Sequence, residues 1–122
     1  MVRNINWNSA NIAVWNKITF PRNNSDKQRG KIASEIMERK EAESEMEKLG
    51  EDADIYIACA GLTRFGGIDA ILGNYICSLL EKIERLEKDK DRRLSLKDAV
   101  NAKMMVNRER IFDENMHHIG KK

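Results

Sequence analysis

Apolar residues recur at three- and four-residue steps along most of this chain, which is the spacing of one face of an α-helix. The pattern predicts five helices, at residues 9–17, 25–50, 51–65, 68–86 and 95–112. The fourth is the most apolar, with a stripe made of Ile68, Leu72, Tyr75, Leu79, Ile83 and Leu86. No segment alternates as a strand would, and residues 113–122 have no periodicity, so we expect a frayed tail. The predicted fold is all-α, a helical bundle formed by a single domain of residues 1–122.

Local signals predict where these helices begin and end. Ser25 and Gln28 have the spacing of a capping box, and so do Ser95 and Asp98. Gly50 is expected to end the second helix, and the charged run of residues 87–93 to end the fourth.

Composition narrows the class of protein. The 22 basic and 20 acidic residues give a net charge of +2, unlike the strongly basic surface of a nucleic-acid binder. Cys59 and Cys77 are too few and too far apart for a disulfide framework, so free thiols in a reducing cytoplasm are expected. No stretch reaches the roughly 20 apolar residues of a membrane span. We therefore expect a soluble cytoplasmic protein that binds neither nucleic acid nor membranes.

Two acid pairs stand out on consecutive predicted helices, Glu35-x-x-Glu38 and Glu51-x-x-Asp54. Residues three or four apart share a helix face, and Glu35 and Glu51 both fall among apolar neighbours. These neighbours are Ala42, Met46 and Leu49 for Glu35, and Ile55, Ala58 and Leu62 for Glu51. Four carboxylates directed inward need a counter-charge, because a buried unpaired carboxylate costs several kcal/mol.

Two kinds of counter-charge are available to these acids. Lys31 and Arg39 lie on the second predicted helix, and a salt-bridged surface is the usual meaning of a charge run. A hard divalent cation such as Mg²⁺ prefers carboxylate oxygens and suits two converging pairs better. The sequence therefore favours a metal site formed by Glu35, Glu38, Glu51 and Asp54, with Mn²⁺ able to replace Mg²⁺.

The spacing of these acids, with twelve residues between the two pairs, resembles the signature of the MazG-like all-α NTP pyrophosphohydrolases. The segments LGEDADIYIACAGL and AVNAKMMVNRERIF also resemble the third and the closing helix of that family, whereas residues 68–93 are longer than in its minimal members. The resemblance implies a homodimer or homotetramer that hydrolyses a (d)NTP to the monophosphate and pyrophosphate at Mg²⁺. Glu35 and Glu38 would be catalytic, and Glu38, at the edge of the stripe, is the candidate general base.

The last predicted helix carries Lys103, Asn107 and Arg110 in one stripe. A triphosphate needs cations and hydrogen-bond donors on the side opposite the metal, and Lys103, Asn107 and Arg110 can supply them. Lys103 is also a candidate catalytic residue. The alternative is that Lys103 and Arg110 pair with surplus acids. The family resemblance likewise implies phosphate contact for this stripe.

Aromatic residues near the N-terminus are candidates for the nucleobase. Trp15 or Phe20 would stack on it, although aromatic residues at helical spacing are usually core, and Asn16 could contact a base edge. The closing helix and the start WNKITFP are most similar to a phage and bacterial branch of dATP/dGTP diphosphohydrolases, the MazZ-like group. That likeness implies a purine deoxynucleotide, and the host cytoplasm if the protein is phage-encoded. His117 and His118 are expected to be ordinary tail residues.

A rival interpretation makes no use of catalysis. The fourth helix is apolar over too broad a face for a lone domain, so a second copy or another protein is expected to cover part of it. The chain would then be a non-enzymatic helical interaction module.

Overall fold

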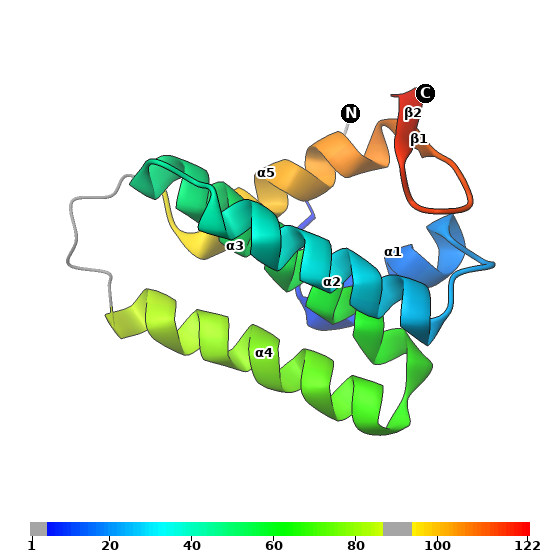
Figure 1. The fold of residues 1–122 in the computed structure, drawn as a ribbon, viewed down its shortest axis with the longest axis horizontal. Coiled ribbons are helices and arrows are strands. Elements are labelled where there is room, and N and C mark those ends of the chain that lie inside the picture. The colour runs from blue at the N-terminus through cyan, green and yellow to red at the C-terminus, as the bar shows by residue number, and fades with distance from the viewer. Residues whose placement is uncertain (1–4, 87–93) are drawn as a thin grey trace.

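The computed structural model describes residues 5–86 and 94–122. In this part of the chain there are five α-helices, a single 3₁₀ turn and one short hairpin (Figure 1). Their bounds are α1 Ser9–Thr19, α2 Ser25–Lys40, α3 Glu45–Leu62, η1 Thr63–Phe65, α4 Gly67–Leu86, α5 Leu96–Arg108, β1 Arg110–Phe112 and β2 His118–Lys121. The all-α bundle of about five helices is confirmed, whereas the expectation of no strand is wrong. The charged run predicted to end the fourth helix lies outside the described residues.

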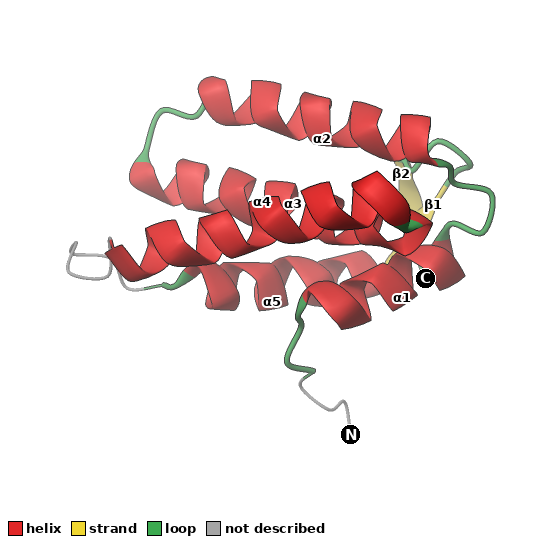
Figure 2. Ribbon diagram, turned by 90° about the horizontal axis from the view of Figure 1, so that it is seen from below, coloured by secondary structure: helices red, strands yellow, loops and turns green. Residues whose placement is uncertain are grey.

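Helix α3 is the centre of the bundle. It packs against α1, α2, α4 and α5, and helices α2 to α5 run roughly along the long axis of the molecule (Figure 2). Every residue from Ile55 to Leu62 is buried, and four of these eight, Ala58, Cys59, Ala60 and Gly61, have small side chains. Small side chains let the surrounding helices approach α3 closely, so this one helix organises the core.

The connection between α2 and α3 differs from the prediction. Helix α2 ends at Lys40, and α3 begins at Glu45, so Gly50 lies inside α3 and ends no helix. Ser44 sets the start of α3, because its Oγ accepts a hydrogen bond of 3.1 Å from the Glu47 amide. The break also moves Met46 off the stripe of Glu35, and Met46 is exposed.

The two predicted capping boxes have different outcomes. Asn24 caps α2 by accepting a 2.8 Å hydrogen bond from the Lys27 amide, so the box predicted at Ser25 is wrong. The Ser25 hydroxyl instead donates to Asp69 of α4. The box that begins with Ser95 is confirmed at α5.

The C-terminal segment folds back as a hairpin. Helix α5 ends at Arg108, and β1 pairs antiparallel with β2, with Ile111 opposite Gly120. Asp113 sets the turn, since its carboxylate accepts hydrogen bonds from the amides of Asn115 and His117, both at 2.9 Å. The predictions of a helix to residue 112 and of a frayed tail are therefore wrong.

Helix α4 buries one side against α3 and leaves a second apolar side exposed. The exposed large side chains on it are Ile68, Ile71, Leu72, Tyr75, Leu79, Ile83 and Leu86. None of the helices in the described ranges combines the length and the apolar character that a membrane crossing needs.

Candidate functional site

The two acid pairs meet where α2 lies beside α3. Glu35, Glu38 and Glu51 each place one carboxylate oxygen within 4.8 Å of the others. Asp54 lies one turn after Glu51 on α3 and accepts a hydrogen bond of 3.2 Å from Lys103 Nζ of α5. The structure thus brings together the four acids that the sequence singled out.

These acids repel one another in a partly dry environment. Burial and the neighbouring charges of Asp54, Glu38 and Glu35 raise the pKa of Glu51. Burial and Glu35 likewise raise the pKa of Glu38, and burial raises that of Asp54 although Lys103 opposes it. Negative charge is therefore concentrated here at a cost to the folded protein.

Lysine pairing neutralises only part of this charge. Lys31 Nζ lies 3.0 Å from Glu35 Oε1, and Lys103 pairs with Asp54, whereas Arg39 pairs with Asp52. Glu35 is only 5% exposed, and within the described residues neither its Oε2 nor Oε2 of Glu51 has a hydrogen-bond partner. The salt-bridge interpretation thus holds in part, but two buried oxygens remain to be satisfied, and a hard divalent cation fits them.

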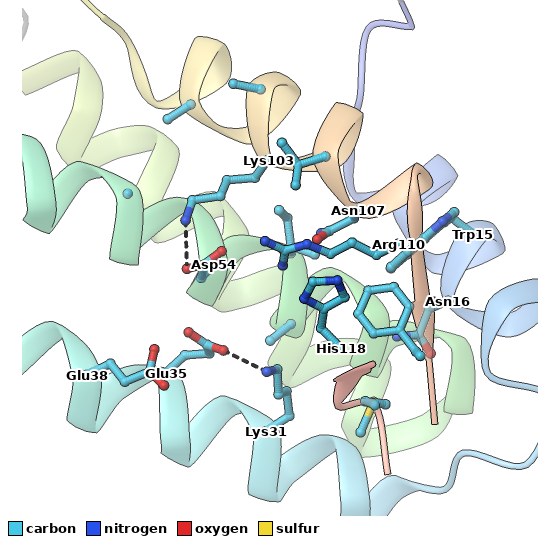
Figure 3. Close-up of a pocket in the computed structure, with 18 of the residues that line it drawn as sticks. Trp15, Asn16, Lys31, Glu35, Glu38, Asp54, Lys103, Asn107, Arg110 and His118 are labelled. Carbon is cyan, nitrogen blue, oxygen red and sulfur yellow. Dashed lines mark hydrogen bonds and ion pairs between the residues drawn. The ribbon is translucent and has the colours of Figure 1, made fainter. Parts of the chain in front are cut away.

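A cleft of about 870 Å³ opens beside the acids. Glu35 and Glu38 line it from α2, and Asp54 lines it from α3 (Figure 3). Lys103 and Asn107 of α5 approach from the other side, as the helix stripe predicts. Acids and donors therefore face each other across one cavity.

The hairpin supplies further residues of this cleft. Arg110 lies on β1, so its predicted place on the helix stripe is wrong, yet it still lines the cleft. His118, which was expected to be an ordinary tail residue, lies beside Arg110 in the same wall (Figure 3). Helical periodicity could not give these positions, because α5 ends at Arg108, before Arg110, and the chain reverses at Asp113, before His118.

One end of the cleft is aromatic. Trp15, Phe20 and Phe112 line it and contact one another edge to face, with ring centroids 5.1 to 6.2 Å apart. Phe112 comes from the hairpin and was not a predicted member. This end offers flat apolar surface of the kind that a nucleobase needs, and stacking by Trp15 or Phe20 stays a prediction.

Beneath the aromatic end lies a buried polar network that sequence reasoning largely missed. Asn16 of α1, Asn23 of the following loop and Gln28 of α2 are all buried and hydrogen-bonded to one another. Arg64 of η1 joins them through Asn16. The residues of this network come from four separate segments of the chain, so no local sequence pattern predicts it.

Comparisons of the chain with protein-family models, with curated proteins and with solved structures find no match.

Proposed function

We propose that the protein is a Mg²⁺-dependent nucleoside triphosphate pyrophosphohydrolase, which converts a (d)NTP and water into the (d)NMP and pyrophosphate. One observation carries the proposal: three carboxylates converge within 4.8 Å, and two of their buried oxygens lack partners within the described residues. Glu35 and Glu38 of this cluster line the cleft into which Lys103 and Arg110 also project, and Glu51 lines an adjoining pocket with Glu38 and Lys103. The family resemblance of the sequence supports the same reaction.

Glu35, Glu38, Glu51 and Asp54 are the residues that would hold the metal. Their oxygens are hard ligands, which suit Mg²⁺ and allow Mn²⁺ to replace it. When bound, the metal would neutralise phosphate oxygens and increase the acidity of the attacking water.

The other side of the cleft would position the triphosphate. Lys103 provides a point charge, Arg110 a planar fork and Asn107 an amide donor, which together match the phosphate oxygens. Lys103 already reaches Asp54, so it can bridge the acid cluster and the charge that develops on the phosphates. Glu38 is more exposed than Glu35 or Glu51, so it is the one of the four acids that would accept a proton from water as a general base instead of binding the metal.

The substrate would be a purine deoxynucleotide, dGTP or dATP, from the cytoplasmic pool. A cleft of about 870 Å³ falls within the size range of small-molecule sites, roughly 300–1,000 Å³. Trp15 and Phe20 would contact the base at the aromatic end.

Pyrophosphate release, measured with Mg²⁺ and with EDTA, tests the reaction. Glu35→Gln removes a buried metal ligand and should reduce release at least about 100-fold, by analogy with the loss of a metal's supporting groups. Glu43→Gln, at an exposed position outside the cluster, is the matched control and should act as the wild type. Equal release by the wild type in EDTA and in Mg²⁺, or full activity of Glu35→Gln, would contradict the proposal.

A second candidate follows from the exposed apolar side of α4, which suits a protein partner. If the chain is an interaction module, Mg²⁺ should not change its thermal midpoint. If the chain binds Mg²⁺ at the acid cluster, the metal should raise that midpoint, because a ligand that binds only the folded state stabilises it. A Mg²⁺-dependent rise therefore favours the enzyme. A homodimer or homotetramer that covers α4 fits either function.

A further inference from the structure

One face of the C-terminal hairpin lines the cleft. Arg110 and Phe112 lie two residues apart on β1 and are half-buried, whereas Ile111 between them is exposed. His118 of β2 lies opposite Phe112 in the register, with the two ring centroids 6.4 Å apart. Residues directly opposite each other in an antiparallel pair project from the same face. Arg110, Phe112 and His118 therefore share the face that borders the cleft (Figure 3).

The turn between the two strands fixes the place of His118. Asp113 holds the turn through the two amide hydrogen bonds that its carboxylate accepts, both of 2.9 Å. Met116 has a left-handed backbone conformation, with φ 66°, and its side chain is buried in the wall of the cleft. A residue other than glycine keeps such a conformation only where its surroundings hold it. His118 follows this anchored residue by two positions, so the hairpin itself sets where the imidazole lies.

The basic side chains of the cleft differ in whether an acid already pairs with them. Two lysines are each held by an acid, at nitrogen–oxygen distances of 3.0 and 3.2 Å, in the pairs Lys31–Glu35 and Lys103–Asp54 (Figure 3). His117 also lines the cleft, and its Nδ1 lies 3.4 Å from Asp113 Oδ2. The side chains of Arg110 and His118, in contrast, have neither an acid nor a hydrogen-bond partner within the described residues. These two groups remain available to a ligand.

An anion would reduce the repulsion among the basic groups of the hairpin. Lys121 lies opposite Arg110 in the register, and like charges directly opposite each other destabilise a strand pair. Histidine gains its proton as the pH falls from about 8 to about 5, and a protonated His118 would add to this positive charge. An anion bound by Arg110 and His118 favours the protonated imidazole, and the protonated imidazole in turn binds the anion more tightly.

We infer that His118 is a further substrate-binding residue, which joins Arg110 on the phosphate chain of the nucleotide and makes binding tighter as the pH falls. The inference rests on the proposed function, because it takes the anion in this cleft to be a nucleotide phosphate. Other charged groups also face this part of the cleft or lie on the adjoining turn, and they are Lys31, Glu35, Glu38, Asp54, Lys103, Arg110, Asp113 and His117. A protein altered only at His118 keeps all of them, so its comparison with the wild type isolates this residue.

Pyrophosphate binding tests the inference without hydrolysis. His118→Gln keeps an N–H donor but cannot carry a charge, and it changes an exposed side chain that the fold does not need. Isothermal titration in Mg²⁺ should compare the two proteins at about pH 6 and at about pH 8. At the lower pH the variant should have a dissociation constant at least about tenfold above that of the wild type, and at the higher pH the two should be equal.

The ratio of the two dissociation constants is the decisive quantity. Protonation of pyrophosphate, of the acid cluster and of the other cleft residues affects both proteins alike, so it cancels in this ratio. A ratio that does not increase from the higher to the lower pH would overturn the inference. Absence of pyrophosphate binding by the wild type at millimolar concentration would also overturn it.

His117 provides a matched control, because its charge already has a partner in Asp113. His117→Gln should bind pyrophosphate as the wild type does at both pH values. The chain has 2 histidines, so the two variants also assign the imidazole C–H resonances in an NMR spectrum. Pyrophosphate should shift the resonance of His118 at the lower pH. An unmoved His118 resonance, or a loss of affinity in His117→Gln as large as in His118→Gln, would overturn the inference.

Hydrolysis and binding separate the two claims. Pyrophosphate release from a (d)NTP, together with equal pyrophosphate affinity of the wild type and His118→Gln at both pH values, removes the inference and leaves the proposed function intact. A pH-dependent loss of affinity in His118→Gln without release from any (d)NTP supports the role of His118 in phosphate binding and contradicts the proposed reaction.

Discussion

At the scale of single residues, the acid cluster is the most unusual feature of this protein. Glu35 is buried although one of its oxygens has no partner among the described residues, and half-buried Glu51 likewise has one buried oxygen without a partner among them. Such groups destabilise a fold unless a ligand compensates them. Sites that bind charged ligands are expected to carry this kind of cost.

Replacing one acid should therefore stabilise the metal-free protein. Glu51→Gln removes a charge that is repelled by Asp54, Glu38 and Glu35, so the free energy of unfolding in EDTA should rise by about 1 kcal/mol. The same variant should lose most of the stabilisation that Mg²⁺ gives the wild type. Urea unfolding with and without Mg²⁺ measures both effects. A Glu51→Gln protein that is less stable in EDTA, yet still strongly stabilised by Mg²⁺, would contradict this account.

The cluster also predicts a dependence on pH. Because the pKa values of Glu38, Glu51 and Asp54 are raised, the folded protein binds protons at these groups more tightly than the unfolded chain. The resulting stabilisation is complete below the ordinary carboxylate pKa of about 4 and is lost as pH rises through the raised values. In EDTA the wild type should therefore be less stable at about pH 8 than at about pH 5, and Mg²⁺ should reduce the difference.

Other carboxylates act in the opposite direction at lower pH. Hydrogen bonds lower the pKa values of Asp69, Asp98 and Asp113. Their contribution to stability is present above about pH 4 and is lost below it, so measurements between about pH 5 and pH 8 avoid the titration of these three aspartates. Glu51→Gln should flatten the pH dependence in this range, and an unchanged slope would show that the cluster is not its source.

At the scale of helices, the approach of α4 to α3 depends on a glycine. A Cβ on Gly73 would collide with the backbone oxygen of Cys59 and lie 2.7 Å from the Thr63 methyl group. Backbone cannot move aside as a flexible side chain can, so this contact fixes how closely the two helices pack.

Two glycine replacements should therefore have opposite effects on stability. Gly73→Ala should lower the free energy of unfolding by about 1–3 kcal/mol through overpacking. Gly30→Ala in α2, where a Cβ meets nothing within 4 Å, should raise it by about 1 kcal/mol through helix propensity. Chemical denaturation of both variants beside the wild type measures the contrast, and a destabilised Gly30→Ala with a neutral Gly73→Ala would refute it.

The helices show which parts of the fold could be read from sequence. Helices α1 and α4 follow their periodicity closely, and Ser95 caps α5 as its local sequence indicates. The boundary between α2 and α3 could not be placed by glycine, because a helix interior tolerates Gly50 once Ser44 provides a cap. Ser44 and Glu47 have the spacing of a helix start, but this signal was less obvious than the glycine.

Other features had no adequate local signal. Strands of three and four residues are too short to show an alternating pattern, so the hairpin that carries Arg110 was missed. The four acids of the site were predictable because they lie on two adjacent helices. The network of Asn16, Gln28 and Arg64 was not, because its bonds join residues far apart in the sequence.

At the scale of the whole molecule, α4 presents an apolar surface that a single chain leaves exposed. Ile71 is 72% exposed and Tyr75 65%. A second copy of the chain would remove this surface from water, which at about 25 cal/mol per Å² is a strong driving force for association.

A charge in the middle of this surface should therefore produce monomers. We expect the wild type to be a dimer or tetramer by size-exclusion chromatography with light scattering, and Tyr75→Glu to be monomeric. Asn74→Glu is the control, because it adds the same charge at an exposed position about 100° around the helix. A monomeric wild type, or an assembly unaffected by Tyr75→Glu, would show that another surface or none is used.

The products formed from a nucleotide decide whether the protein is a pyrophosphohydrolase. Phosphorus NMR of dGTP incubated with the protein and Mg²⁺ distinguishes cleavage at the α-phosphorus from cleavage at the γ-phosphorus in one spectrum. Our account predicts resonances of pyrophosphate and dGMP in equal amounts, and none of them when EDTA replaces Mg²⁺. Orthophosphate with dGDP, or intact nucleotide for dGTP and every other (d)NTP tried, would contradict it.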